Sequence, residues 1–234
     1  MQQRNKLRKQ LRSELIDAVV PAPGPVTAVR EMRKRAGRYA VEIAGVVLAP
    51  VSVEMIAESQ LAVGCDVDQG TLDRLIVATR QVACFDRALE ALARRSRSAR
   101  DLERWLRDRD FSTAEIAPAL DRLAELGMLD DLAFARGFAH SRAVGRGFGL
   151  RRVAAELGRH GVANAVVATV ITELRERQVG GEQAALEAAA QKRARALGKL
   201  EPEVARRRLM AWLVRRGFAL GEAAGAARRA LARR

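Results

Sequence analysis

Apolar positions recur with the same spacing three times along the chain, which indicates an internal repeat. In each copy, an apolar residue is followed by others five, ten and fourteen positions later. The three sets are Leu106, Phe111, Ile116 and Leu120; Leu157, Val162, Val167 and Ile171; and Leu213, Phe218, Ala223 and Ala227. An internal repeat determines the architecture of a chain, so it is considered before any shorter motif. We therefore expect three copies of one helical unit.

A tight turn between two helices explains the five-residue step. When a helix ends in a left-handed residue, the next side chain folds back onto a residue five positions earlier. Gly161 and Gly217 occupy the left-handed position in the second and third copies. Asp110 occupies it in the first copy, where Ser112 and Glu115 have the spacing of a capping box for the next helix. Each copy is therefore predicted to contain a helix, a tight turn and a second helix.

One more helical stretch precedes each of these pairs. The stretches are 80–94, 131–145 and 182–198, and Asp130 or Asp131 is the expected cap of the second. Repeats of this kind pack mainly on their neighbours. The predicted fold class is mainly α, with tandem three-helix modules that form an elongated curved body and a small N-terminal β-hairpin region.

The segment before the repeats has a different pattern. Between residues 26 and 51, Tyr39, Val41 and Ile43 alternate with polar or small residues, and Ala44-Gly45 suits a turn. Short helices are expected at 53–60 and 71–80. The predicted organisation is a flexible basic arm with a proline-rich linker at 1–25, the hairpin and short helices at 26–80, and modules at 81–130, 131–180 and 181–234.

Positive charge is concentrated in the C-terminal part of the chain. The formal net charge is +14; residues 182–234 hold 13 basic and 5 acidic residues, whereas residues 81–135 hold 9 basic and 11 acidic ones. Such a charge says nothing about the fold, but it predicts attraction to nucleic acid or to another acidic surface. Only five of the cations are lysines. The alternative is therefore that codon bias supplies arginine wherever any cation would serve for solvation alone.

Two groups of cations are candidate binding residues, and an ordinary solvated surface is the alternative interpretation of each. The first group surrounds a glycine-rich turn, where a helix N-terminus and guanidinium groups suit phosphate or carboxylate. The second lies on the third module, where positions seven apart share a helix face. Trp105 and Trp212, each directly before the turn leucine, are interpreted as packing residues. The candidates are Arg142, Arg146, Arg151 and Arg152, then Lys192, Arg193, Arg195, Arg208 and Arg215.

Catalytic and metal-binding motifs are missing from the sequence. Cys65 and Cys84 lack CxxC spacing, and His140 and His160 have no ligand-like neighbours. No phosphate-binding loop of the G-x-x-x-x-G-K type is present. We therefore expect no enzyme, no cofactor and no metal. Without a signal or membrane-spanning segment, the expectation is a cytoplasmic protein.

A set of motifs spread over roughly residues 26–232 carries a resemblance to a known family. The motifs are Gly127-Met-Leu-Asp-Asp-Leu-Ala-Phe-Ala135, Arg142, Gly147, Gly149, Arg97-Ser98, Arg216-Gly217-Phe218 and the hairpin with Tyr39. With them the sequence resembles the RecX family of regulators of the RecA recombinase, although Asp110 departs from the commoner glycine. That resemblance implies tandem three-helix modules that bind RecA and its filaments on single-stranded DNA, and it implies inhibition of strand exchange, ATP hydrolysis and coprotease activity, with a role in DNA repair and the SOS response. A monomer and weak direct nucleic acid binding are further expectations.

A free-standing DNA-binding protein is the alternative function. Two short helices joined by a tight turn also suit a helix-turn-helix that places its second helix in the major groove. The second helices are expected at 112–126, 164–177 and 220–234, and the first of these is acidic.

Overall fold

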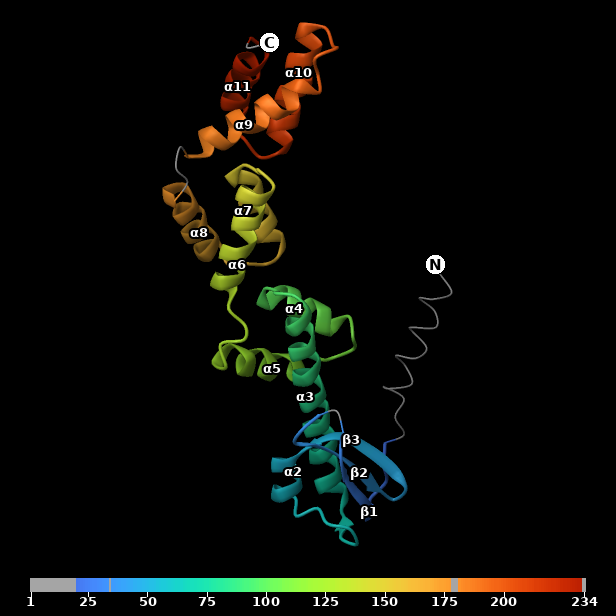
Figure 1. The fold of residues 1–234 in the computed structure, drawn as a ribbon. Helices are drawn as coiled ribbons and strands as arrows, with labels where there is room; N and C mark the ends of the chain where they lie inside the picture. Colours follow the sequence, from blue (N-terminus) through green and yellow to red (C-terminus); the bar gives the residue numbers. More distant parts are fainter. Residues whose placement is uncertain (1–19, 34, 178–180, 233–234) are drawn as a thin grey trace. The chain divides into compact units, whose positions relative to one another are not determined.

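The structure is a computed structural model that describes residues 20–33, 35–177 and 181–232 (Figure 1). The chain divides into two compact units. The first contains residues up to 88 together with 111–119, and the second contains 89–110 and the residues from 120 onward. The arm predicted for residues 1–19 lies outside the described residues.

A four-stranded antiparallel sheet is the centre of the first unit. Its strand order is β3-β2-β1-β4. The alternating pattern places Val41 and Ile43 in the core with no exposed surface. Ala44 and Gly45 form the turn between β2 and β3, both with positive φ. The predicted hairpin is confirmed, and two further strands complete the sheet. The strands are β1 (Gly24–Glu31), β2 (Arg38–Ile43), β3 (Val46–Ser52) and β4 (Asp66–Val67).

Strand β1 begins inside the segment predicted as a linker. Gly24 and Pro25 pair with Val67 and Asp66 of β4. Proline is tolerated at the start of a strand, where its missing N–H does not interrupt the ladder. The proline-rich composition of residues 21–25 therefore hid the true start of the sheet.

One long helix replaces two that the sequence predicted separately. Helix α2 (Val53–Glu58) forms as expected, and the Ser52 hydroxyl accepts the Met55 N–H at 3.2 Å. The helices expected at 71–80 and 80–94 are a single helix, α3 (Gln69–Arg94). No proline or glycine interrupts residues 71–94, so nothing ends the first stretch. Leu72 and Leu75 of α3 belong to the core cluster of the sheet.

Two thiols of the first unit differ in their surroundings. Cys84 is completely buried. That burial, with the nearby Glu115 carboxylate, raises the pKa of the Cys84 thiol to about 12, so it stays protonated near neutral pH. Cys65 is half-buried, and both are free cysteines.

Glu115 stabilises the start of its own helix. Its carboxylate accepts the Ser112 backbone N–H at 2.7 Å, as the predicted capping box requires. The same carboxylate pairs with Arg80 of α3, including a contact of 3.3 Å from Nη2 to Oε2. Burial alone would raise the pKa of Glu115, but the hydrogen bonds from Arg80 and Ser112 outweigh it and leave the pKa below its ordinary value. Glu115 is therefore an ionised, fully engaged group.

Helices follow one another in threes after the sheet, as the repeat predicted. The first module comprises α3, α4 and α5; the second, α6, α7 and α8; and the third, α9, α10 and α11. A π-helical turn, η1 (Ser141–Gly145), extends α6 where one longer helix was expected. The bounds are α4 (Ala99–Arg107), α5 (Thr113–Glu125), α6 (Asp131–His140), α7 (Leu150–Arg159), α8 (Asn164–Arg177), α9 (Gly181–Arg195), α10 (Pro202–Arg215) and α11 (Leu220–Ala232).

The second and third modules each have a hydrophobic core of their own. In the second, Val153 and Leu157 of α7 pack with Val170 of α8. In the third, Leu209 of α10 packs with Leu186 of α9 and with alanines of α11. Among the described residues, no helix combines the length and the apolar character that crossing a bilayer requires.

Hydrogen bonds close the two glycine turns. In the second module, the Val162 N–H donates to the Leu157 carbonyl at 3.2 Å, and the Gly161 N–H donates to the Gly158 carbonyl at 2.9 Å. In the third, the Phe218 N–H donates to the Leu213 carbonyl at 3.3 Å. These are the bonds of the Schellman motif. Asp110 has φ of +63°, so the first copy also uses a left-handed residue.

Candidate functional site: joints between modules and a cationic groove

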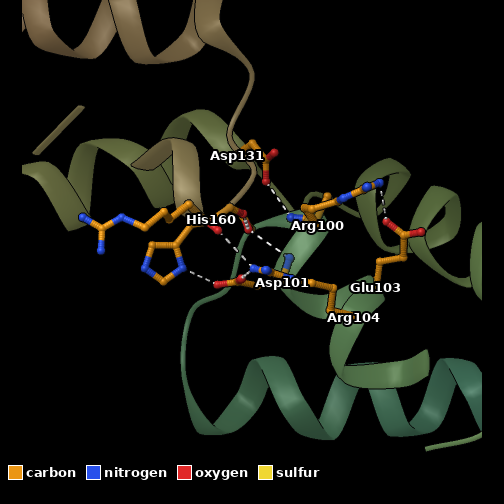
Figure 2. A network of polar contacts seen from close by, with 9 residues as sticks. Arg100, Asp101, Glu103, Arg104, Asp131 and His160 are labelled. Carbon is orange, nitrogen blue, oxygen red and sulfur yellow. Dashed lines mark hydrogen bonds and ion pairs between the residues drawn. The ribbon is translucent and has the colours of Figure 1, made fainter. Parts of the chain in front are cut away.

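The turn of the second module is bound by the start of α4. The Ser98 hydroxyl caps α4 through the Asp101 N–H at 3.1 Å and also donates to the carbonyl of His160, the last residue before the glycine. Arg104 donates to the Arg159 carbonyl at 3.2 Å. Figure 2 shows this network, in which the His160 ring also contacts the Asp101 carboxylate. Two carbonyls that the helix leaves unpaired at its end are thus satisfied by the preceding module.

A carboxylate closes the same joint from the other side. Asp131, in the first turn of α6, accepts the Ala99 N–H at 2.8 Å (Figure 2). Its neighbour Asp130 caps α6 itself, accepting the Leu132 and Ala133 N–H groups at 2.8 and 3.0 Å. The sequence left open which aspartate is the cap. In the structure, Asp130 caps α6 and Asp131 binds the start of α4.

The joint between the second and third modules repeats this arrangement. The Gly149 N–H, at the start of α7, donates to the Arg216 carbonyl at 2.8 Å. Arg152 donates to the Arg215 carbonyl at 3.0 Å. Glu182 of α9 accepts the Leu150 N–H at 2.9 Å, just as Asp131 accepts Ala99. In both joints, the carboxylate lies 32 positions after the N–H that it accepts.

The third module has no equivalent place for a further module within residues 181–232. Helices α4 and α7 begin seven residues before their turn leucine, whereas α10 begins eleven residues before Leu213. The extra turn puts Ala205 where Ser98 and Gly149 lie in the earlier modules. The Ala205 N–H donates to the Glu201 carbonyl of its own helix at 2.9 Å. The start of α10 therefore differs from the starts of α4 and α7, each of which binds the turn of the following module.

Two of the four cations predicted around the glycine-rich turn are engaged internally. Glu156, with a side chain only 12% exposed, pairs with Arg142 Nε at 3.0 Å and with Arg152 Nε at 2.9 Å. Arg142 also lies over the Phe138 ring, and Arg152 over Phe148. Both guanidinium groups stabilise the second module, and Arg152 is also part of a joint.

Arg146 and Arg151, the other two, are exposed. The Arg146 carbonyl accepts a hydrogen bond from Arg216 at 2.7 Å, while its own side chain faces solvent. Burial and the neighbouring Arg152 guanidinium lower the pKa of Arg216. Partner binding by these arginines stays a prediction, and it rests mainly on Arg146 and Arg151.

The residue before the turn leucine contacts two arginines in every module. It is tryptophan in the first and third modules and glutamate in the second. Trp212 packs against the core of the third module, as the sequence interpretation expected. A ring face and a carboxylate both attract guanidinium groups. The arginine pairs are Arg97 and Arg109 at Trp105, Arg142 and Arg152 at Glu156, and Arg193 and Arg216 at Trp212.

A cationic groove lies between α9 and α10 of the third module. We use this name for the hollow of about 400 Å³ that is lined by four arginines together with a leucine, an alanine and a tryptophan. Three of the arginines are predicted site residues, and all four are exposed. Within the described part of the chain, none of the four forms an ion pair with a carboxylate. The lining is Arg193, Arg207, Arg208 and Arg215, with Leu197, Ala211 and Trp212.

The groove gathers some of the predicted cations and leaves others out. Lys192 and Arg195 are exposed on α9 but do not line it. Arg207 and Trp212 line it, although the sequence reasoning did not include them. Their signal was present in the spacing, because Arg207 and Ala211 are four apart and Arg208 and Trp212 are four apart, so each pair lies on one side of α10.

Metal ligation has no support in the arrangement of side chains. Among the residues that the structure describes, no three His, Cys, Asp or Glu side chains gather as a metal site requires. His160 is held by Asp101 and packs edge-on against Phe134 and Phe138.

Comparison with known proteins identifies the modules. Three family models match, described as the first, second and third three-helix domains of RecX, at residues 84–123, 130–171 and 181–223. Regulatory protein RecX of Thermobifida fusca is 36% identical over 133 residues, which is 57% of this chain and 70% of that protein. Regulatory protein RecX of Levilactobacillus brevis is 31% identical over 116 residues, which is 50% of this chain but only 44% of that protein.

A solved structure has a similar fold. A crystal structure of regulatory protein RecX aligns with a TM-score of 0.68, covering 86% of this chain and 97% of the other, at 18% sequence identity. At that identity, the likeness bears on the fold alone. It agrees with a mainly helical chain that carries three three-helix domains and a small N-terminal strand region.

Proposed function

Starting from the fact that this chain belongs to the RecX family of regulatory proteins, we propose that it binds RecA and RecA filaments on single-stranded DNA. In this proposal it inhibits the recombinase, ATPase and coprotease activities and so modulates DNA repair and the SOS response. RecX is a family of regulators, not of enzymes. The chain acts as a monomer in the cytoplasm, where RecA filaments form on DNA.

The observation that carries the proposal is the run of three matched modules with basic side chains on the second and third. A filament presents the same surfaces again and again, so tandem modules can add many weak charged contacts along it. The exposed cations that support this role are Arg146, Arg151, Lys192, Arg193, Arg195, Arg208 and Arg215.

The position of the groove favours a filament regulator over a free-standing helix-turn-helix protein. A helix-turn-helix reads DNA with the helix after the turn, which in the third module is α11. The groove is lined instead by residues of α9, of α10 and of the segment between them. Sequence-selective binding to duplex DNA in the absence of RecA would support the alternative.

The test is RecA ATP hydrolysis on single-stranded DNA with this protein in excess. We expect the rate to fall as the protein is added, and unchanged hydrolysis at saturating excess would contradict the proposal. Arg151→Glu and the pair Arg208→Glu/Arg215→Glu should weaken inhibition, because these side chains are exposed and unpaired in the described structure. The pair Arg175→Glu/Arg228→Glu, on exposed faces of α8 and α11, is the charge-matched control.

A further inference from the structure

We propose that Arg216 is a positioning residue, which fixes the third module against the second and so holds the basic side chains of the two modules at a constant spacing. The inference rests on the proposed function, because the spacing matters only where both modules contact the same partner. Arg216 acts through the joint between the modules and not through a contact of its own with RecA or DNA.

The Arg216 side chain and backbone both bond the second module. Its Nη1 donates to the carbonyls of Arg146 and Gly147, at 2.7 and 3.0 Å. Arg146 is the residue at which η1 ends. The Arg216 carbonyl accepts the N–H of Gly149, the residue directly before α7, at 2.8 Å. One residue of the third module therefore spans the segment that joins η1 to α7.

Stacking places the same guanidinium between one aromatic ring from each module. It lies 5.2 Å from the centre of the Phe148 ring in the second module and 4.4 Å from that of Trp212 in the third. Among the described residues, no carboxylate forms an ion pair with Arg216. Burial and the neighbouring Arg152 guanidinium lower its pKa, so holding the charge there opposes stability. Of the groups that offset this cost, all but Trp212 belong to the second module.

The equivalent residues of the other modules support an assignment to the joint. Arg109, His160 and Arg216 each stand directly before the left-handed residue of their turn. The His160 ring contacts Asp101 of the preceding module (Figure 2). In the first module, Arg109 donates to the Trp105 carbonyl of its own module at 2.8 Å. In both modules that follow another module, this side chain therefore reaches back to the module before it.

The partner of this residue differs between the joints because the preceding helix differs. The third residue of α4 is Asp101, whereas the third residue of α7 is Arg152. A carboxylate at this place attracts the His160 ring, but a guanidinium repels Arg216. Arg152 donates to the Arg215 carbonyl at 3.0 Å instead. Arg216 therefore suits the second joint by binding uncharged carbonyls rather than a carboxylate.

A fixed spacing strengthens binding that depends on several weak contacts. Linked sites act at an effective concentration that is highest when their separation matches the sites on the partner. Exposed cations lie on both sides of this joint, among them Arg146 and Arg151 in the second module and Arg208 and Arg215 in the third. A loose joint leaves each of these side chains in place but lowers their effective concentration. Loss of Arg216 should therefore weaken inhibition although both modules stay folded.

Amide hydrogen exchange of the full chain, followed by NMR without RecA, tests the joint itself. Two amides donate across it, namely those of Gly149 to the Arg216 carbonyl and of Leu150 to the Glu182 carboxylate. Arg216→Ala removes neither acceptor. We expect both amides to exchange about tenfold faster or more in this variant, since a hydrogen bond from a charged donor is worth at least that factor.

The module cores and a second variant provide the controls. Leu157 and Leu209 are completely buried in the second and third modules, so their amides report opening of the cores and should change by less than about twofold. Arg228→Ala removes the same charge from an exposed position of α11 and should leave all four amides unchanged. Unchanged joint amides in Arg216→Ala would overturn the proposal. Equal acceleration in the cores would also overturn it, because the arginine would then only stabilise a module.

Titration of RecA ATP hydrolysis on single-stranded DNA with the same variants separates this inference from the proposed function. Arg216→Ala should need about tenfold more chain for half-inhibition than Arg228→Ala and should reach the same inhibition in excess. Equal half-inhibition by the two variants, with a loosened joint, would overturn the positioning role and leave the proposed function standing. An original chain that leaves hydrolysis unchanged would contradict the proposed function, while faster exchange of the joint amides would still uphold Arg216 as the residue that fixes the third module.

Discussion

A Cβ atom placed on Gly217 would lie 2.4 Å from the Cβ of Arg152, in the module before it. Gly161 stands in the same relation to Arg100, also at 2.4 Å. Both glycines have positive φ, of +96° and +76°. These positions therefore need glycine for two reasons, the left-handed backbone and the close approach of a helix of the preceding module.

Gly217→Ala should lower the free energy of unfolding by about 2 kcal/mol or more, since the left-handed backbone alone costs an L-residue 1–2 kcal/mol and the clash with Arg152 adds to it. Chemical denaturation measures the loss. Gly158→Ala is the matched control, because Gly158 is helical and a Cβ there meets nothing within 4 Å. That variant should be as stable as the original chain or more stable. Equal effects at both positions would show that neither the left-handed backbone nor the close approach makes glycine necessary at 217.

Asp110→Gly should raise the melting temperature. Asp110 has φ of +63°, and glycine adopts this conformation without the steric cost that a Cβ brings. The gain should be at most about 1 kcal/mol, because glycine also has a more flexible unfolded state. Differential scanning calorimetry is the measurement, and a clear drop in melting temperature would show that the Asp110 side chain matters more than its backbone.

Ser98→Ala should cost more than the loss of an ordinary helix cap. Ser98 is completely buried, caps α4 and donates to the His160 carbonyl. Ser52, which caps α2, is the comparison, and Ser52→Ala should cost about 1 kcal/mol. Ser98→Ala should cost about 1 kcal/mol beyond that, since a buried carbonyl loses its partner. Denaturation of both variants decides the matter, and equal costs would mean that the joint gains nothing from the serine.

Acid should remove the stabilisation that Glu115 provides. Its pKa is lower in the folded chain than in the unfolded one, so its contribution is present above the unfolded value of about 4.3 and is lost as the pH falls through the folded value. Glu115→Gln should therefore destabilise the protein near neutral pH, by about 2 kcal/mol, and the difference should shrink in acid. Unfolding at a series of pH values tests this against Glu176→Gln, an exposed control. A difference that stays constant with pH would contradict it.

The repeat could be predicted from the sequence because it depends on local chemistry. The pattern consists of a left-handed glycine and two apolar residues five positions apart. It indicates the same turn wherever it occurs. The hairpin was likewise visible, because alternation marks a strand with one buried face. Strand β4 has only two residues, which is too short for alternation to show.

The joints could not be predicted, because they depend on residues far apart in the sequence. Nothing local shows that Glu182 accepts the Leu150 N–H or that Glu156 pairs with Arg142. The sequence grouped Arg142, Arg151 and Arg152 by proximity along the chain, but folding makes two of them internal. The sequence selected Arg208 and Arg215 because positions seven apart share a helix face, but Arg207 also lines the groove, whose cations come from both α9 and α10.

Co-sedimentation with RecA filaments assembled on single-stranded DNA tests the central claim most directly. The chain should pellet with the filaments at low salt, with less pelleting as salt rises, and Arg208→Glu/Arg215→Glu should pellet less than Arg175→Glu/Arg228→Glu at every salt concentration. A chain that stays in the supernatant at low salt, while RecA itself pellets, would contradict the claim that it binds RecA filaments.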